Sequence, residues 1–210
     1  MDPERIVAVF GSPRRRGNTA ALLEAAVEGA REAGARVDPI VLRDLKIAPC
    51  LEIYGCRIDG ECRIQDDFQS VRARVLAAGG IMLASPIFYY AVSAQVKILM
   101  DRFHSLWVKR HWVERAAGGP RLRRRGLFIA AGATRGPRLF EGALLSVRCF
   151  FDTLDCDLWK SLLYRGLDHE DEARGRPELL AEAQQAGAAL ARLLRERGPG
   201  GETQPTGENP

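Results

Sequence analysis

Residues 6–19 read Ile-Val-Ala-Val-Phe-Gly-Ser-Pro-Arg-Arg-Arg-Gly-Asn-Thr and combine an apolar run, a polar loop and the start of a helical pattern. The run from Ile6 to Phe10 is typical of a strand that is buried on both faces. The loop breaks at Gly11 and Pro13, and the helical pattern begins at Asn18-Thr19. A helix that starts directly after a strand and a short loop points free backbone N–H groups at one place, where anions and above all phosphates bind. The stretch therefore predicts an anion site at the end of a strand.

The spacing of the glycines indicates which phosphate the loop suits. Gly11 and Gly17 are six residues apart, so neither the G-x-G-x-x-G pattern nor a P-loop is present, and Asn18 stands where a P-loop has its lysine. A mononucleotide monophosphate is therefore the favoured ligand. Hydrogen-bond donors for the phosphate are available from the short side chains of Ser12, Asn18 and Thr19, and Arg14 supplies one positive charge. On this stretch alone, an ordinary strand-to-helix connection with a solvated arginine run remains an alternative.

Composition limits the class of protein. The chain has 210 residues, of which 46% are hydrophobic and 28% charged, as expected for one globular domain with a sizeable core. Its net charge of +4 suits an anionic ligand. No apolar stretch is long enough to span a membrane, and residues 1–5 leave no room for a signal peptide, so we expect a cytoplasmic protein. Five cysteines, an odd number, argue against a disulfide framework.

Strand-like and helix-like segments alternate along the chain. Strands are predicted at residues 6–10, 37–42, 80–85, 126–131 and 156–163, and helices at 20–34, 67–78, 92–103, 138–154 and 177–197. This order predicts an α/β three-layer sandwich with a parallel sheet, whose ligands sit beyond the carboxyl ends of the strands. Three loops, 11–19, 85–90 and 131–136, would gather there. One domain is expected over residues 1–197, followed by a disordered tail over 198–210, which is rich in Gly, Pro, Glu and Thr.

Two of these loops carry a family resemblance. Gly-Ser-Pro-Arg-x-x-Gly-Asn-Thr at residues 11–19 and Ser-Pro-Ile-Phe-Tyr at residues 85–89 together resemble the NADPH-dependent FMN reductase family. The likeness continues into the helix that follows the second motif and covers about residues 5–165. The family is a branch of the flavodoxin-like superfold that also includes iron–sulfur flavoproteins and quinone reductases. The resemblance implies a five-stranded parallel sheet of order 2-1-3-4-5, helices on both faces, and FMN as cofactor.

The resemblance also implies site residues. It places the FMN phosphate on Ser12, Arg14, Gly17, Asn18 and Thr19. It places the isoalloxazine and ribityl parts against Pro86, Ile87, Phe88 and Tyr89, with Gly132 of the third loop approaching the ring. A planar ring needs an apolar or aromatic wall, and backbone N–H groups beside it can tune its potential. The alternative is that Phe88, Tyr89 and Tyr90 are core or interface aromatics.

The cysteines match an iron–sulfur flavoprotein pattern only in part. That pattern is C-x2-C-x2-C followed by a fourth cysteine; three of its positions are filled here by Cys50, Cys56 and Cys62, and Ile53 occupies the second. A [4Fe–4S] cluster normally takes four thiolates, so neither a cluster nor any other metal site is expected. Residues 44–66 are interpreted as a loop that covers the site or builds a subunit contact. Two further cysteines are predicted to be buried: Cys149 and Cys156.

The resemblance implies an FMN-dependent NAD(P)H oxidoreductase. Hydride from NAD(P)H would reach flavin N5 and then a small acceptor such as a flavin or a quinone, in a ping-pong mechanism. The cofactor carries this chemistry, so no catalytic acid or base is named. A homodimer or higher homo-oligomer is expected, with residues 91–115 as the candidate surface.

A non-enzymatic flavodoxin-like electron carrier and a cofactor-free binding module are the alternatives to this enzyme. Nucleic acid is not an expected partner, since the basic runs at 14–16 and 121–125 lack interleaved aromatics, and the second run is favoured to be solvated.

Overall fold

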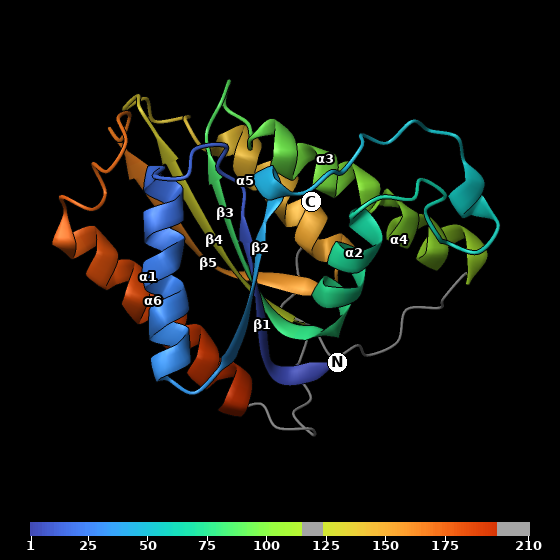
Figure 1. Cartoon of the computed structure of the whole chain (residues 1–210), viewed down its shortest axis with the longest axis horizontal. Coiled ribbons are helices and arrows are strands. Elements are labelled where there is room, and N and C mark those ends of the chain that lie inside the picture. The colour runs from blue at the N-terminus through green and yellow to red at the C-terminus, as the bar shows by residue number, and fades with distance from the viewer. Residues whose placement is uncertain (115–123, 197–210) are drawn as a thin grey trace.

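The computed structural model describes residues 1–114 and 124–196 (Figure 1). Five strands form one parallel sheet in the order β2-β1-β3-β4-β5. They are β1 (Asp2–Phe10), β2 (Arg36–Val41), β3 (Ala78–Pro86), β4 (Arg124–Gly132) and β5 (Cys156–Arg165). This is the flavodoxin-like order that the resemblance implies, so the predicted fold class is confirmed. The predicted disordered tail, residues 198–210, lies outside the described residues.

Helices cover both faces of the sheet, as Figure 1 shows. On one face lie α1 (Asn18–Glu32) and α6 (Pro177–Glu196), and on the other α2 (Phe68–Ala77), α3 (Ala94–Arg102), α4 (His104–Val108) and α5 (Glu141–Thr153). Three short helical turns complete the described elements: η1 (Leu42–Asp44), η2 (Gly55–Arg57) and η3 (Lys109–Val113). None of the described helices has the length and apolarity needed to cross a membrane.

Successive side chains of β1 point to opposite faces of the sheet and pack into two separate cores. Ile6 and Ala8 pack in the cluster under α1 and α6, whereas Val7 and Val9 pack in the cluster under the other helices. All four side chains are at most 3% exposed. A central parallel strand must be apolar on both faces, which is why this run appears as a continuous apolar sequence. Packing on both faces of β1 thereby fixes the place where the loop after Phe10 begins.

Glycines let α1 and α6 approach each other closely. A Cβ at Gly29 would lie 2.0 Å from the carbonyl oxygen of Gln184, and one at Gly187 would lie 1.8 Å from that of Ala26. No side chain fits at either distance, so the two helices touch backbone to backbone. This contact fixes the positions of the two segments that lead into these helices.

One expectation about the basic runs is wrong. The sequence favours a solvated run at residues 121–125, but Arg124 is 7% exposed. Its guanidinium donates to the backbone carbonyls of Ala78, Leu154 and Leu76. Burial lowers the pKa of Arg124. Residues 121–123 lie outside the described part of the chain.

Candidate functional site

The loops after β1, β3 and β4 are joined to one another. The backbone N–H of Gly11 donates to Ala84 O at 2.8 Å, and the hydroxyl of Ser93 donates to Gly11 O at 2.6 Å. The N–H of Ile87 donates to Ala131 O at 2.9 Å, which ties the second loop to the third. The predicted gathering of the three loops at the carboxyl edge of the sheet is therefore present.

These loops enclose a cavity of about 210 Å³. It brings together residues of both sequence motifs, and most of the predicted site residues line it: Ser12, Arg14, Gly17, Asn18, Thr19, Pro86, Ile87, Phe88 and Gly132. The segments 11–19 and 86–88 thus lie close enough to contact one small molecule. One FMN bound by both motifs, as the resemblance implies, requires this juxtaposition.

Tyr89 does not line this cavity. Phe88 and Ala91 exchange backbone hydrogen bonds of 3.0 and 2.9 Å, so Tyr89 and Tyr90 form the two-residue tip of a hairpin, with φ of +50° and +63°. Left-handed backbone is unfavourable for bulky residues, and glycine or asparagine is the usual choice at such tips. The side chain of Tyr89 is fully exposed, and those of Phe88 and Tyr90 are 49% and 61% exposed. These three aromatics are therefore not core residues, and a place for them in an interface stays a prediction.

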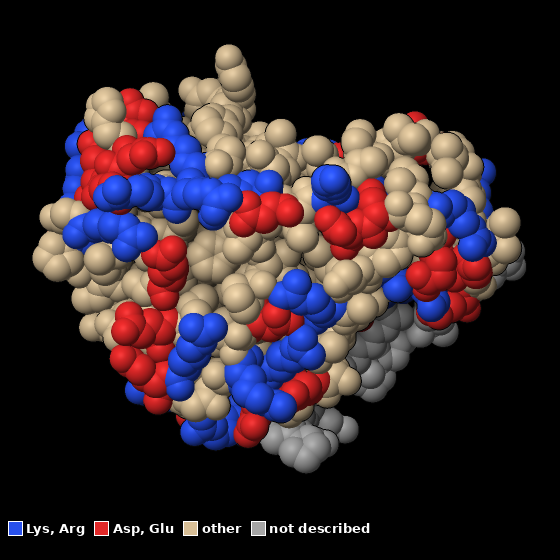
Figure 2. Space-filling view, in the orientation of Figure 1, with Lys and Arg blue, Asp and Glu red and all other residues tan. Residues whose placement is uncertain are grey.

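Residues 11–19, which we call the phosphate loop after their predicted ligand, are compact and leave the start of α1 uncapped. Ser12 lies beneath Gly17, where a Cβ would come within 2.5 Å of its hydroxyl oxygen. That hydroxyl accepts from Arg14 N and donates to Arg14 O, both at 3.1 Å. No described side chain caps the helix N-terminus at Gly17. Figure 2 shows Lys and Arg side chains over this end of the molecule, with Asp and Glu side chains beside them. The end of the cavity at α1 therefore has a positive helix terminus with Arg14 beside it, which suits an anion.

A fourth wall of the cavity comes from the segment after β5. Leu167 and Asp168 line it, and Arg14 donates to Asp168 O at 2.9 Å. Asn18 donates to His169 O at 2.8 Å. This wall was not predicted from the sequence. The available signal was β5 itself, because its carboxyl end must reach the same edge of a parallel sheet as the other three loops.

A second, larger cavity of about 680 Å³ lies among residues 50–64, α3, α4 and α5. Four cysteines line it: Cys50, Cys56, Cys62 and Cys149. Burial raises the pKa of the Cys56 thiol, and the neighbouring Cys62 and Cys50 add to the shift. Cys149 is exposed on α5, so its predicted burial is wrong, whereas Cys156 is buried as expected. The two cavities share no lining residue among those described.

The cysteines of this cavity bear on metal binding. Within residues 1–114 and 124–196, no group of three or more His, Cys, Asp or Glu side chains is arranged to hold a metal ion. Within the same described residues, none of the five cysteines forms a disulfide. At the second position of the iron–sulfur flavoprotein pattern, Ile53 is 59% exposed and offers no ligand.

Known proteins resemble this chain in sequence and in fold. An iron–sulfur flavoprotein of Methanocaldococcus jannaschii is 35% identical over 131 residues, which cover 62% of this chain and 63% of the relative. The chain thus spans less than two thirds of that relative's length, and about half that of several others. The solved NAD(P)H:quinone oxidoreductase from Methanothermobacter marburgensis has a TM-score of 0.64 at 19% identity, over 89% of this chain and 98% of its own.

A second solved structure is an FMN-dependent NADH-azoreductase from Bacillus anthracis in complex with FMN. It has a TM-score of 0.64 at 15% identity, and the match covers 89% of this chain and 99% of the azoreductase. At such identities the solved structures support the fold alone. The family is shown by the sequence. Residues 5–147, more than half of the chain, match the model of the NADPH-dependent FMN reductases, and both motifs lie inside that range. The chain belongs to the NADPH-dependent FMN reductase family.

Proposed function

We propose that this chain oxidises NAD(P)H through bound FMN and passes the electrons to a small acceptor, such as a flavin or a quinone, in a ping-pong sequence. Membership in the NADPH-dependent FMN reductase family supports FMN as the cofactor and oxidoreductase as the enzyme class. The acceptor and the order of steps are our proposal. The observation that carries it is the single cavity lined by both motifs.

The phosphate of FMN suits the end of the cavity at α1. Backbone N–H groups at the start of this helix, the hydroxyl of Thr19 and the guanidinium of Arg14 lie there, and the hydroxyl of Ser12, bonded to the backbone of Arg14, lies beside them. Thr19 is 2% exposed and Ser12 4%, so both hydroxyls belong to a preformed site. Pro86, Ile87 and Phe88 supply the apolar wall that a flat ring requires.

The cavity is smaller than typical ligand pockets, which run from about 300 to 1,000 Å³. At about 210 Å³ the cavity suits part of FMN. The remainder of the cofactor would lie against the half-exposed Phe88 at the mouth of the cavity. Bound FMN supplies hydride chemistry, and the chain supplies binding and orientation. Arg14 and Asp168 are the ionisable side chains among the described lining residues. Neither is assigned a proton-transfer role.

The iron–sulfur cluster named for the Methanocaldococcus relative does not fit these residues. Four thiolates are the usual ligands, and the pattern here supplies Cys50, Cys56 and Cys62 with Ile53 at the remaining position. The described side chains also form no metal-holding group of three. No step of the proposed reaction passes through a cluster.

Assembly and location form part of the proposal. We propose a homodimer or higher homo-oligomer that uses the surface at residues 91–115, of which residues 91–114, including α3, α4 and η3, are described. We also propose a cytoplasmic protein, supported by five cysteines that form no disulfide in the described part of the chain, since disulfides are rare in reducing compartments. Light scattering of the purified protein tests the assembly.

Spectroscopy and rapid kinetics test the reaction. The protein reconstituted with FMN is expected to show a flavin spectrum that NADH or NADPH bleaches in a stopped-flow instrument, and a quinone or free flavin then restores it. A bound flavin that neither nucleotide reduces directly would favour the electron-carrier alternative. A protein that stays colourless after addition of FMN would favour the cofactor-free binding module.

A further inference from the structure

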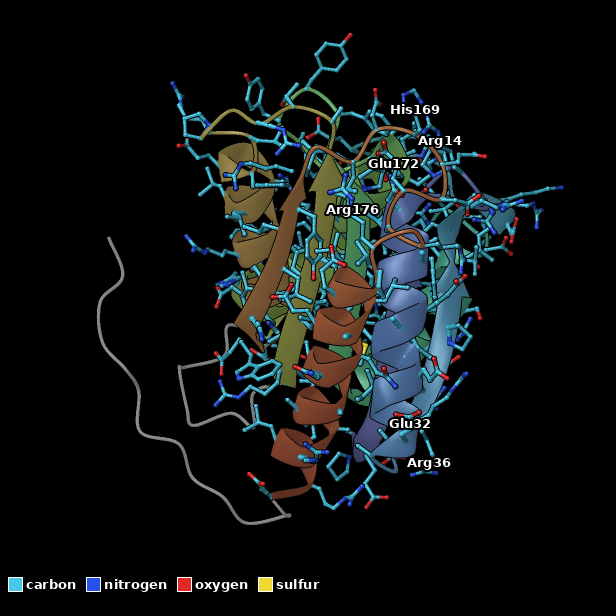
Figure 3. The ribbon with its side chains drawn as sticks, turned by 90° about the vertical axis from the view of Figure 1, so that its left-hand side faces the viewer. Arg14, Glu32, Arg36, His169, Glu172 and Arg176 are labelled. Carbon is cyan, nitrogen blue, oxygen red and sulfur yellow. The ribbon has the colours of Figure 1, made fainter. Side chains whose placement is uncertain are left out.

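The larger cavity, which we call the thiol cavity, takes no part in the proposed reaction. It has a volume of about 680 Å³ and lies between residues 50–64 and the helices α3, α4 and α5. Residues 50–64 are the cyan segment beside α4 in Figure 1. In Figure 3, α1 and α6 face the viewer, so the thiol cavity lies on the far side of the sheet there. Its volume is typical of sites for small organic molecules.

Aromatic side chains give the thiol cavity flat walls. His104 and Trp107 both line it, and their rings stack with centroids 5.5 Å apart and planes 12° apart. Phe150 lines it from α5. An aromatic ring gains from such surroundings, because it can stack on one wall and meet another edge to face. The walls therefore favour an occupant that contains a planar ring.

Thiols are the second feature of this cavity. Four of them line it, from two parts of the chain: Cys50, Cys56, Cys62 and Cys149. No group of three described His, Cys, Asp or Glu side chains is arranged to hold a metal ion, so these sulfur atoms do not surround a single point. A thiolate is a strong nucleophile. The thiols therefore favour an occupant with an electrophilic carbon atom.

Among these four thiols, that of Cys62 has a cation beside it. Desolvation opposes the charge of the buried Arg102, but interactions with Asp66 and Cys62 outweigh desolvation and raise the pKa of Arg102. Within the described part of the chain, the Nε–H of Arg102 is buried and makes no hydrogen bond. This guanidinium therefore has a donor to spare for negative charge on the sulfur of Cys62. Cys56 differs, because burial raises the pKa of its thiol and favours the protonated form.

We propose that the thiol cavity binds aromatic compounds that carry an α,β-unsaturated carbonyl group, and that Cys62 captures them covalently. The sulfur of Cys62 forms a bond to the β-carbon, the electrons of the carbon–carbon double bond move towards the carbonyl group, and the proton of the thiol ends on the α-carbon. Thiol and ligand supply every atom and electron of the adduct, so no oxidant or reductant takes part. Lys97 and His104 line the cavity and are donors for the carbonyl oxygen. The capture is independent of the proposed flavin reaction.

N-phenylmaleimide tests the proposal on the reduced wild-type protein, since it joins an aromatic ring to an unsaturated carbonyl group. Peptide mass spectrometry follows the adduct at each cysteine. Cys62 is expected to react about tenfold faster than Cys149, although Cys149 is exposed and Cys62 is only partly exposed. N-methylmaleimide has the same electrophile without the aromatic ring. With each rate divided by that of glutathione, N-methylmaleimide is expected to modify Cys62 about tenfold more slowly than N-phenylmaleimide.

Two variants complete the test. Cys62→Ser is expected to lose the fast adduct. Cys149→Ser is the matched control, which removes another thiol of the same cavity and is expected to leave the rate at Cys62 within about twofold of the wild type. Should Cys62→Ser fail to fold, the two maleimides on the wild type still decide the question. Adduct formation at Cys149 before Cys62, or equal normalised rates of the two maleimides at Cys62, would overturn the proposal. Neither outcome bears on the proposed function, because NAD(P)H bleaching of the flavin is measured separately.

Discussion

Arg102 donates to both carboxylate oxygens of Asp66, at 2.6 and 3.1 Å, from a side chain that is 1% exposed. The same guanidinium donates to Ala48 O at 2.8 Å and to Ile64 O at 2.9 Å. One buried cation therefore holds both ends of the segment that carries Cys50, Cys56 and Cys62. Burial alone would raise the pKa of Asp66, but hydrogen bonds from Arg102 and from backbone N–H groups outweigh it and lower this pKa.

Arg102→Met is expected to lower the free energy of unfolding by about 3–5 kcal/mol, because it leaves Asp66 and two carbonyls without their shared donor. Urea denaturation measures the loss. Arg63→Met is the matched control, since Arg63 pairs with Asp59 at 2.8 Å with both side chains more than 40% exposed. The control is expected to change stability by less than about 1 kcal/mol. Similar losses in the two variants would contradict the role assigned to Arg102.

The lowered pKa of Asp66 also predicts a pH dependence. The folded pKa lies below the unfolded value of about 3.9, so the carboxylate stabilises the fold above that value. This contribution is lost as the pH falls through about 3.9 towards the folded pKa. The stability difference between the wild type and Asp66→Asn should therefore be largest near neutral pH and shrink in acid. Denaturation curves collected between pH 7 and pH 3 measure it, and a difference that is constant with pH would count against the argument.

Local signals explain what the sequence could predict. The apolar run at residues 6–10 and the glycine-bearing loop after it are contiguous, so strand, loop and helix start could be recognised without knowing any neighbour. The segment 166–176 between β5 and α6, which supplies the fourth wall of the cavity, could not be found in this way. Asn18 and Ala173 are 155 positions apart, and no periodicity indicates that the amide of one meets the backbone of the other. Cys149 shows the same limit, because helical spacing defines a face of α5 but not whether another element covers it.

Gly187→Ala is expected to destabilise the protein by about 1–3 kcal/mol, since the new methyl group would overlap the carbonyl oxygen of Ala26 and force α6 away from α1. Thermal unfolding followed by circular dichroism measures the change. Gly136→Ala is the control, because nothing lies within 4 Å of a Cβ there. It is expected to be neutral or slightly stabilising, by up to about 1 kcal/mol, through a smaller unfolded-state entropy. A Gly187→Ala protein as stable as Gly136→Ala would show that the helices adjust without cost.

Phe88→Ala tests the aromatic wall of the proposed flavin site. Phe88 lines the cavity yet is 49% exposed, so its removal should leave the fold almost unchanged. If the ring of FMN packs against it, affinity falls by about 2- to 10-fold, as expected for one lost aromatic pair. Trp112 is 44% exposed and does not line this cavity, so Trp112→Ala provides a matched loss of exposed aromatic surface. Fluorescence titration of both apoproteins with FMN measures the effect. Equal affinities in the two variants would remove Phe88 from the flavin site, while the phosphate loop would retain its assignment.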